Sequence, residues 1–324
     1  MSRYTAIVVL LMLSFSCLAS ETVETAPPER PDPTIRVATY NVLNLFDHVD
    51  DPAITGDIDY LPMATTDGRC RSLAEVIRRV DADVLALQEV ESEAALLWFR
   101  DTYLDGMGYD HVVSLDVGYA RGVENAVLSR FPLMNAEAKP NIPLQDVVRH
   151  GGGWAEPGDG DEAATYQRTP LRVDVAGPDG YLITMFVVHH KSGRHKYRRE
   201  SEALKLVELI GAVEQEDPAR NIIVLGDFNA APWDRSMDVY GEAGFIDIGA
   251  DPRSERPRTH ESDRILDFVL LNSAAHREYV GGSVTVHESQ APPKDYDWRK
   301  DPRPDACPSD HRAVSIDLRP ADRK

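Results

Sequence analysis

The sequence has few cysteines and lacks the short motifs that mark several large enzyme classes. Its 324 residues include 3 cysteines, and no two of them form a Cys-x-x-Cys pair. There is no His-Glu-x-x-His pair either, so the usual zinc signatures are missing. A Gly-x-Ser-x-Gly elbow for a serine nucleophile and a P-loop are also absent. These absences disfavour a zinc-motif enzyme, a serine hydrolase of that type and a P-loop nucleotidase.

The N-terminus has the pattern of an export signal. Arg3 is followed by an apolar run at residues 6–13 and by small residues at 14–20. The run is shorter than the roughly 20 residues that a membrane-spanning helix needs, and it suits the core of a signal peptide. We therefore predict a signal peptide over residues 1–20, with a buried N-terminal helix as the alternative. A polar, Pro-rich linker is predicted over residues 21–35.

Two routes of processing are open after this signal. Cys17 lies in a segment that resembles a bacterial lipoprotein box, which predicts a lipid anchor at this cysteine. Ordinary cleavage near Ala19 or Ser20 is the alternative. In both cases we expect an exported protein, which is periplasmic, secreted or lipid-anchored at the cell envelope. The mature protein is expected to have no transmembrane helix.

Cys70 and Cys307 would remain in the mature chain. In an oxidising compartment they can form a disulfide, and two separate buried thiols are the alternative. The formal net charge of −19 indicates an acidic surface. Such a surface repels polyphosphate backbones and argues against tight, metal-free, non-specific DNA binding. A nuclease is not excluded, because bound cations or a local arginine cluster can invert the field at a site.

Segments with the spacing of strands and helices alternate irregularly along the chain. No linker interrupts residues 36–320, which predicts a single catalytic domain over that range. Helical periodicity is found at residues 72–80, 92–103 and 199–214. Short apolar runs predict strands at residues 35–42, 84–88, 125–128, 171–175, 181–189, 221–225, 264–271 and 313–318.

Polar side chains gather at the ends of these predicted strands, where α/β enzymes place catalytic groups. They mix carboxylates, amides and imidazoles: Asn41, Glu89, His190, Asp227, Asn229, Asp310 and His311. Carboxylate and amide oxygens are hard ligands, which suit Mg²⁺, Mn²⁺ or Ca²⁺. The set predicts metal-assisted attack of water on phosphorus.

The order of seven motifs resembles the endonuclease/exonuclease/phosphatase family. The motifs are TYNVLNLFD, ALQEVES, NAVLSRFPL, VVHHKSGR, VLGDFNAAPWD, RILDFVLLN and SDHRAV. They cover nearly all of the predicted mature chain. The resemblance implies an α/β fold, a four-layer sandwich of two mixed β-sheets flanked by helices, with the site at one end.

The resemblance also implies roles for the strand-end residues. Glu89 matches the main metal ligand, and Asp310 resembles a ligand of the metal or of a water network. Asn41 matches an amide that helps to hold metal and phosphate. Asp227 and Asn229 match the pair that orients the attacking water and the phosphate.

Two histidines complete the implied site. His311 resembles an imidazole that contacts phosphate and is held by a carboxylate. Asp267 matches that carboxylate because it lies inside an apolar strand, and Asp263 is the rival. Charge pairing between a buried Asp and a His favours the imidazolium form. His190 matches the second imidazole, and its neighbour His189 is expected to point to the opposite face of the strand.

A third group is implied to contact the substrate. Arg168 matches an arginine that contacts phosphate. Lys191 and Arg194 belong to the densest basic run of the chain, where a polyanionic substrate is expected to dock. A solvated helix start is the alternative reading of this run.

Together these observations predict an exported, monomeric phosphoesterase that depends on Mg²⁺, Mn²⁺ or Ca²⁺. The favoured substrate is nucleic acid, which makes the protein a nuclease or phosphodiesterase. A lipid or inositol-phosphate phosphoesterase is the alternative, because Asp263-Arg-Ile-Leu266 resembles a phosphatase motif. A non-catalytic binding domain on the same fold is the third hypothesis.

Overall fold

The computed structural model describes residues 33–49, 63–149, 165–249, 256–297 and 299–321. The predicted signal peptide, the candidate lipid anchor at Cys17 and residues 21–32 of the predicted linker lie outside the described residues. The first strand begins at Ile35 and the last ends at Leu318.

Two six-stranded mixed sheets form the centre of the molecule. The first has the strand order β13-β14-β1-β2-β4-β3. In chain order its strands are β1 (Ile35–Leu45), β2 (Val84–Val90), β3 (His111–Ser114), β4 (Glu124–Ser129), β13 (Thr285–His287) and β14 (Ala313–Leu318). Within it, β1 and β2 run parallel, whereas β14 pairs antiparallel with β1.

The second sheet has the order β11-β12-β10-β9-β8-β5. Its strands are β5 (Leu133–Glu137), β8 (Leu171–Ala176), β9 (Leu182–His189), β10 (Asn221–Asp227), β11 (Ile246–Asp247) and β12 (Asp267–Leu271). Strands β8 and β9 pair antiparallel and are joined by a single 3₁₀ turn, Pro178–Gly180. Two short strands, β6 (Ile142–Pro143) and β7 (Thr165–Tyr166), pair apart from both sheets.

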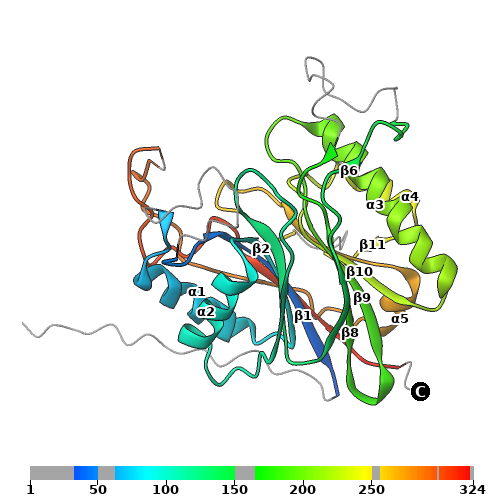
Figure 1. The fold of residues 1–324 in the computed structure, drawn as a ribbon, viewed down its shortest axis with the longest axis horizontal. Helices are drawn as coiled ribbons and strands as arrows, with labels where there is room; N and C mark the ends of the chain where they lie inside the picture. The colour runs from blue at the N-terminus through cyan, green and yellow to red at the C-terminus, as the bar shows by residue number, and fades with distance from the viewer. Residues whose placement is uncertain (1–32, 50–62, 150–164, 250–255, 298, 322–324) are drawn as a thin grey trace, which may run out of the picture.

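Helices cover the outer faces of the two sheets (Figure 1). The first sheet is covered by α1 (Asp67–Val80) and α2 (Glu93–Tyr103). The second is covered by α3 (Lys196–Glu216) and α4 (Arg235–Glu242), and the short α5 (Ser273–Glu278) contacts β10 and β12. The order of helix, sheet, sheet and helix confirms the predicted four-layer sandwich.

Each sheet buries both of its faces. Side chains of a strand alternate between the faces. In β9, Met185 and Val187 enter the core between the sheets, whereas Phe186 and Val188 pack beneath the helices of the second sheet. Because both faces are covered, the strand is a continuous apolar run in the sequence. The alternation decides which polar residue at a strand end faces the space between the sheets.

Helix α1 and strand β12 are among the predicted elements that begin at different residues from those expected. Helix α1 begins at Asp67 rather than at 72, because the Thr66 hydroxyl caps it by accepting a hydrogen bond from the Arg69 backbone N–H. Strand β12 begins at Asp267 rather than at 264. The Thr259 hydroxyl accepts hydrogen bonds from the backbone N–H groups of Leu266 and Asp267, which holds the preceding segment in a turn.

Cys70 and Cys307 are both buried free thiols. The structure therefore favours the alternative of two separate thiols over a disulfide. None of the helices in the described part of the chain has both the length and the apolar character that a membrane span needs.

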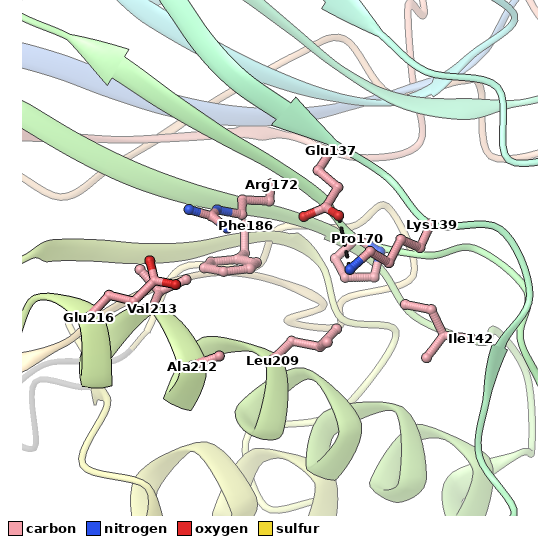
Figure 2. A pocket seen from close by; sticks show the side chains of 10 residues that line it. All are labelled: Glu137, Lys139, Ile142, Pro170, Arg172, Phe186, Leu209, Ala212, Val213 and Glu216. Atoms are coloured by element: carbon pink, nitrogen blue, oxygen red, sulfur yellow. Dashed lines mark ion pairs between the residues drawn. The ribbon is translucent and has the colours of Figure 1, made fainter.

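A small pocket lies between α3 and the edge of the second sheet (Figure 2). Phe186, Leu209 and Val213 are among its lining residues. At its rim, Lys139 Nζ lies 2.9 Å from Glu137 Oε1. Its lining includes none of the residues predicted for the site, so the chemistry has to be sought elsewhere.

One buried histidine of the first sheet makes stability depend on pH. Burial, with the nearby charges of Arg36 and Arg79, lowers the pKa of His287 from 6.5 to about 4. Between these values the unfolded chain binds a proton that the folded chain does not, so stability falls as the pH falls. His287 Nε2 lies 2.8 Å from Ser315 Oγ, a contact that a glutamine can keep.

We therefore expect His287→Gln to reduce the loss of stability in mild acid. From about pH 7 to about pH 5 the wild type should lose about 2 kcal/mol more than the variant. Urea unfolding of both proteins at the two pH values measures this difference. Parallel losses in the two proteins would show that His287 is not the group responsible.

Candidate active site

Three polar residues from adjacent strands lie side by side at one end of the second sheet. Asp227, the last residue of β10, is paired in register with His189 on β9 and with Asp267 on β12. Residues paired in this way share a face of the sheet. All three continue the series of side chains that fills the core between the sheets. The polar row therefore closes one end of that core.

A backbone irregularity at the end of β2 positions Glu89. The register of β2 against β4 shifts between Gln88 and Val90, and Glu89 has a φ of 65°. A bulge of this kind changes the direction of a side chain and is common next to functional sites. The Glu89 carboxylate accepts a hydrogen bond of 3.2 Å from the Asn44 backbone N–H. Glu89 thus lies at the end of the first sheet, beside the irregular part of β1 that follows Asn41.

The segment before β14 joins the two sheets at this end. The Ser309 hydroxyl donates to the Asn41 carbonyl at 2.7 Å and accepts from the His311 backbone N–H at 3.1 Å. Asn41 Nδ2 in turn donates to Asp227 Oδ2 at 3.2 Å. These bonds bring Asn41, Asp227 and His311 together, although they are far apart in the sequence.

His311 is held as a buried imidazolium. Its Nδ1 lies 3.0 Å and 2.9 Å from the two carboxylate oxygens of Asp267, and its Nε2 lies 3.7 Å from Asp227 Oδ2. Burial alone would lower the pKa of His311, but the charges of Asp267 and Asp227 raise it well above its usual value. The structure thus pairs His311 with Asp267 rather than with the rival Asp263.

The carboxylate of Asp227 is held in place by hydrogen bonds to both of its oxygens. Its Oδ1 accepts from the Asn229 backbone N–H at 2.8 Å, and its Oδ2 accepts from Asn229 Nδ2 at 2.9 Å. Burial raises the pKa of Asp227 to about 6, against the opposing charge of His311. The carboxylate is therefore ionised at neutral pH and more basic than an exposed aspartate, which suits it to accept a proton from water.

Asp310 faces a histidine that the sequence did not indicate. His260 Nδ1 accepts from the Ser262 backbone N–H at 3.0 Å, which leaves the proton on Nε2, 3.3 Å from Asp310 Oδ2. Burial would raise the pKa of Asp310, but this hydrogen bond and the charge of His311 lower it well below its usual value. Asp310 is therefore an anion under all ordinary conditions.

The surroundings of Asp310 fit a divalent cation. Among the described residues, Asp310 Oδ1 is buried and has no hydrogen-bond partner. A buried anionic oxygen without a partner is costly unless a cation satisfies it. Asp310, His260 and His311 offer ligand atoms within 4.8 Å of one another. Asp227, Asp267 and His311 also do so, but there the close approach is accounted for by the ion pair of His311 with Asp267.

Glu89 has a cationic partner within the chain. Arg121 Nη2 lies 2.6 Å from Glu89 Oε2, and Nη1 lies 3.0 Å from Oε1. The same guanidinium contacts Asn44 Oδ1 at 2.5 Å. Glu89 thus forms a bidentate ion pair at a position where a metal would have to compete with the arginine.

The prediction that His190 lies in the site is wrong, and His189 takes its place. His189 Nε2 lies 3.5 Å from Asp227 Oδ2 and 3.6 Å from Glu89 Oε1. His190 is fully buried on the opposite side of the sheet, where its Nδ1 contacts the Tyr166 hydroxyl at 2.9 Å and its Nε2 the Tyr240 hydroxyl at 2.8 Å. The expectation that the two rings face opposite sides was right, but the assignment was reversed.

Arg168 is brought to this side of the site. Its Nη1 contacts His189 Nε2, and its Nη2 donates to the His190 carbonyl at 2.7 Å. Burial lowers the pKa of His189 well below its usual value, and the charges of Arg168 and Arg121 add to the effect. One end of the sandwich therefore holds a neutral imidazole, His189, and a cationic one, His311. Separated pKa values of this kind mark acid and base roles.

The predicted basic docking run, which extends from Lys191 to Arg199, has a buried part and a more exposed part. Arg198 and Arg199 are buried and form ion pairs within the protein, with Arg199 Nη2 3.3 Å from Asp234 Oδ2. Arg194 is exposed, and Lys191 is half-buried, with its backbone N–H donating to Glu202. A contact of Lys191 or Arg194 with substrate stays a prediction.

An open cleft of about 1140 Å³ adjoins the site. Asn44, Arg121, His260 and Asp310 line the side that belongs to the site. The cleft continues past Arg264 and Arg303 to Tyr296 and the prolines around it. Arginines therefore line the path that leads to the carboxylates, in a chain that is acidic overall.

The two neighbouring histidines should respond differently to replacement. We expect His189→Ala to lower the rate of phosphoester hydrolysis about 10²-fold or more with little loss of stability. His190→Ala should instead destabilise the fold by about 3 kcal/mol, because it leaves a cavity and two buried tyrosine hydroxyls without their partner. Steady-state kinetics and urea unfolding of both variants measure the two effects. Loss of activity in a stable His190→Ala variant, with normal activity in His189→Ala, would show that His190 is the histidine of the site.

The chain matches the model of a known family and resembles solved structures. The model described as the endonuclease/exonuclease/phosphatase family matches residues 38–311. A comparison with curated proteins found no match. The fold resembles the human Nocturnin catalytic domain, solved with a bound sulfate anion, at 18% identity and a TM-score of 0.55 over 88% of this chain and 94% of that one.

Two other similar structures come from different organisms. Truncated Caenorhabditis elegans TDP2 has 15% identity and a TM-score of 0.52, over 88% of this chain and 97% of that chain. A mannosyl-6-phosphatase of Bacteroides thetaiotaomicron has 16% identity and a TM-score of 0.54, over 87% and 98%. At such identities the likeness shows the fold alone.

Proposed function

The chain belongs to the endonuclease/exonuclease/phosphatase family, and from that premise we propose that it hydrolyses the phosphodiester bonds of nucleic acid with the help of a divalent metal ion. One observation carries the proposal. A cationic His311 faces Asp227 across 3.7 Å at the end of the sandwich, and Asp310 Oδ1, which has no hydrogen-bond partner among the described residues, lies 3.9 Å from His311 Nε2. This set of charges suits metal-assisted attack of water on phosphorus.

The residues of the chain divide the chemistry among them. Asp227 accepts the proton of the attacking water, and Asn229 and Asn41 fix the orientation of its carboxylate through their amide groups. His311 donates from Nε2 to an oxygen of the phosphate and stabilises the negative charge that grows there. Asp267 keeps His311 charged and oriented. Each role depends on a contact that is already formed in the protein.

Mg²⁺, Mn²⁺ or Ca²⁺ would be held by the oxygens of Glu89, Asp310 and Asn41. When bound, such an ion supplies positive charge to the phosphate and lowers the pKa of a bound water. These ligands are hard oxygen donors, which suit the three ions. Arg121 pairs with Glu89 in this structure, so a metal bound by Glu89 would share that carboxylate with the arginine.

The size of the cleft supports a polymer over a small phosphate ester. It is larger than a sugar phosphate requires and it is open. Arg121, Arg264 and Arg303 line it beside Glu261 and Asp301, and Arg303 pairs with Glu261. Local arginine charge is what an acidic protein needs in order to bind a polyanion. The alternative of a lipid, inositol-phosphate or sugar-phosphate substrate rests on the Asp263-Arg-Ile-Leu266 string, whose Arg264 lines the same cleft.

A panel of substrates and metals tests the proposal. Purified protein is incubated with single-stranded and double-stranded DNA, RNA, sphingomyelin, inositol phosphates and mannose 6-phosphate, with Mg²⁺, Mn²⁺ or Ca²⁺ and with EDTA. We expect cleavage of nucleic acid with at least one metal and none with EDTA. Nucleic acid left intact with every metal, alongside release of phosphate from a lipid or sugar ester, would support the alternative.

We further propose that the enzyme acts outside the cytoplasm. The proposal rests on the sequence pattern of residues 1–20 and on nothing in the described structure. Expression of the full chain should yield a mature protein whose N-terminus lies close to Cys17 or Ser20. Mass spectrometry identifies that N-terminus and any lipid attached to Cys17. An uncleaved Met1 terminus in the cytoplasm would contradict it.

A further inference from the structure

One large aromatic side chain beside the site is exposed. Trp233 follows the Asp227–Asn229 motif by four residues and exposes 79% of its surface. Trp98 packs against the core beside α1 and α2. An indole left in water forgoes a large gain in hydrophobic free energy, and here the exposed ring lies next to the residues of the site, where a ligand can cover it.

Trp233 is presented by a rigid turn. The Asp234 backbone N–H donates to the Ala231 carbonyl at 2.9 Å, and Asp234 Oδ2 accepts from the Ala231 backbone N–H at 3.1 Å. Arg199 holds the same carboxylate from α3, and Asp234 is also the N-cap of α4. Pro232 occupies the second position of the turn and restricts it further. A side chain on such a turn loses little entropy when it binds a ligand.

Trp233 lines a pocket of about 200 Å³ that includes Asn229 of the site. Three arginines, Arg199, Arg258 and Arg264, line the same pocket together with Asp234 and Asp263. Because Arg199 pairs with Asp234, Arg258 and Arg264 are the two arginines that remain to face a ligand. Arg264 also lines the larger cleft, so the pocket and the cleft meet at this residue. The pocket thus offers a flat aromatic face, positive charge and direct access to the catalytic end of the sandwich.

We propose that Trp233 is a stacking platform for a nucleobase of single-stranded nucleic acid, next to the phosphate that is cleaved. The inference rests on the proposed nuclease function and names its substrate class. Stacking on an aromatic side chain does not depend on the base, because every base has a π-face. Arg258 and Arg264 would contact the backbone phosphates on either side of that base.

Single-stranded nucleic acid is favoured over a duplex for a physical reason. In a duplex both faces of each base are covered by neighbouring bases, and exposing one face costs unstacking energy. One indole on a surface turn cannot insert into the stack from outside without that cost.

Binding measurements with two matched ligands test the proposal. One ligand is a short, fluorescently labelled single-stranded oligonucleotide with nuclease-resistant phosphorothioate linkages. The other has the same length, linkages and label but no bases. Affinities are measured by fluorescence anisotropy in Mg²⁺ for the wild type, Trp233→Ala, Trp233→Phe and the control Met134→Ala. Met134 is an exposed apolar residue on the edge strand β5.

We expect Trp233→Ala to bind the ligand with bases about tenfold more weakly and the base-free ligand as the wild type does. Trp233→Phe should recover most of the loss, and Met134→Ala should change neither affinity. Equal affinity of Trp233→Ala and wild type for the ligand with bases would overturn the inference. An equal loss for both ligands would also overturn it, because the indole would then not be reading the base.

Failure of the inference is separable from failure of the proposed function. A wild type that cleaves nucleic acid but whose binding ignores Trp233 loses only the stacking platform. A wild type that leaves every nucleic acid intact and releases phosphate from a lipid or sugar ester loses the nuclease function, and the stacking platform with it.

Discussion

Replacing His311 with glutamine is expected to lower kcat/KM for phosphodiester hydrolysis about 10³-fold. Glutamine can still donate a hydrogen bond to Asp267, but it carries no positive charge. The variant therefore removes the charge that faces the phosphate and leaves the buried Asp267 with a partner. Alanine would leave that carboxylate unpaired in the core, which costs about 3 kcal/mol or more and would confuse activity with folding.

The measurement is steady-state hydrolysis of the best substrate from the panel, with urea unfolding to verify the fold. His276→Gln is the matched control, because His276 is exposed on α5 and touches none of the site residues named above. The control should keep the wild-type rate. A His311→Gln variant with wild-type kcat/KM would show that the imidazolium is not part of the reaction.

Replacing Glu89 with glutamine is expected to have the second large effect, with a loss of about 10³-fold in rate at limiting metal and a weaker affinity for the metal ion. The substitution removes the negative charge while keeping the size of the side chain. It also frees Arg121 from its bidentate ion pair. Calorimetric titration with Mn²⁺ measures the metal affinity separately from turnover.

Glu91→Gln is the matched control for Glu89. Glu91 is a neighbouring buried carboxylate whose Oε2 accepts from the Asp47 backbone N–H, a bond that glutamine can keep. It should bind metal and turn over substrate like the wild type. If Glu89→Gln binds Mn²⁺ as tightly as Glu91→Gln does, Glu89 is not a metal ligand.

The sequence was sufficient to predict that polar residues at strand ends lie close together. The parallel strands β9 and β10 carry their last residues to the same edge of the sheet, and the antiparallel strand β12 brings its first residue there. The Asp267 assignment followed from its position inside an apolar strand, and the structure places Asp263 in a turn with a φ of 59°. The proximity of the strand-end residues and the pairing of Asp267 with His311 could both be predicted because each depends only on where a residue lies along its own strand.

The choice between His189 and His190 could not be made from pattern alone. Both faces of β9 are buried, so the strand shows no alternation of polar and apolar residues to identify the inner face. Only the register with Asp227 places His189 in the site. The same register places Met185 and Val187 in the core between the sheets. The sequence cannot indicate this, because Phe186 and Val188 on the other face are apolar as well.

His260 and Glu89 depend on features that lie beyond local pattern. His260 comes close to Asp310 because its segment forms an isolated antiparallel bridge with His311, far along the chain. Glu89 was predicted as a metal ligand, but regular alternation would have turned its side chain toward α1 and α2 with Leu85 and Leu87. The bulge in β2 changes the direction of the Glu89 side chain. No residue of that strand indicates a bulge in the sequence.

The most direct measurement of the central claim is an anomalous difference map from a crystal soaked in Mn²⁺. We expect a peak about 2.0–2.6 Å from a carboxylate oxygen of Asp310 or Glu89. This peak should be lost in crystals of Glu89→Gln. A peak elsewhere, or none, in crystals of a protein that hydrolyses phosphodiesters only with added metal would contradict it.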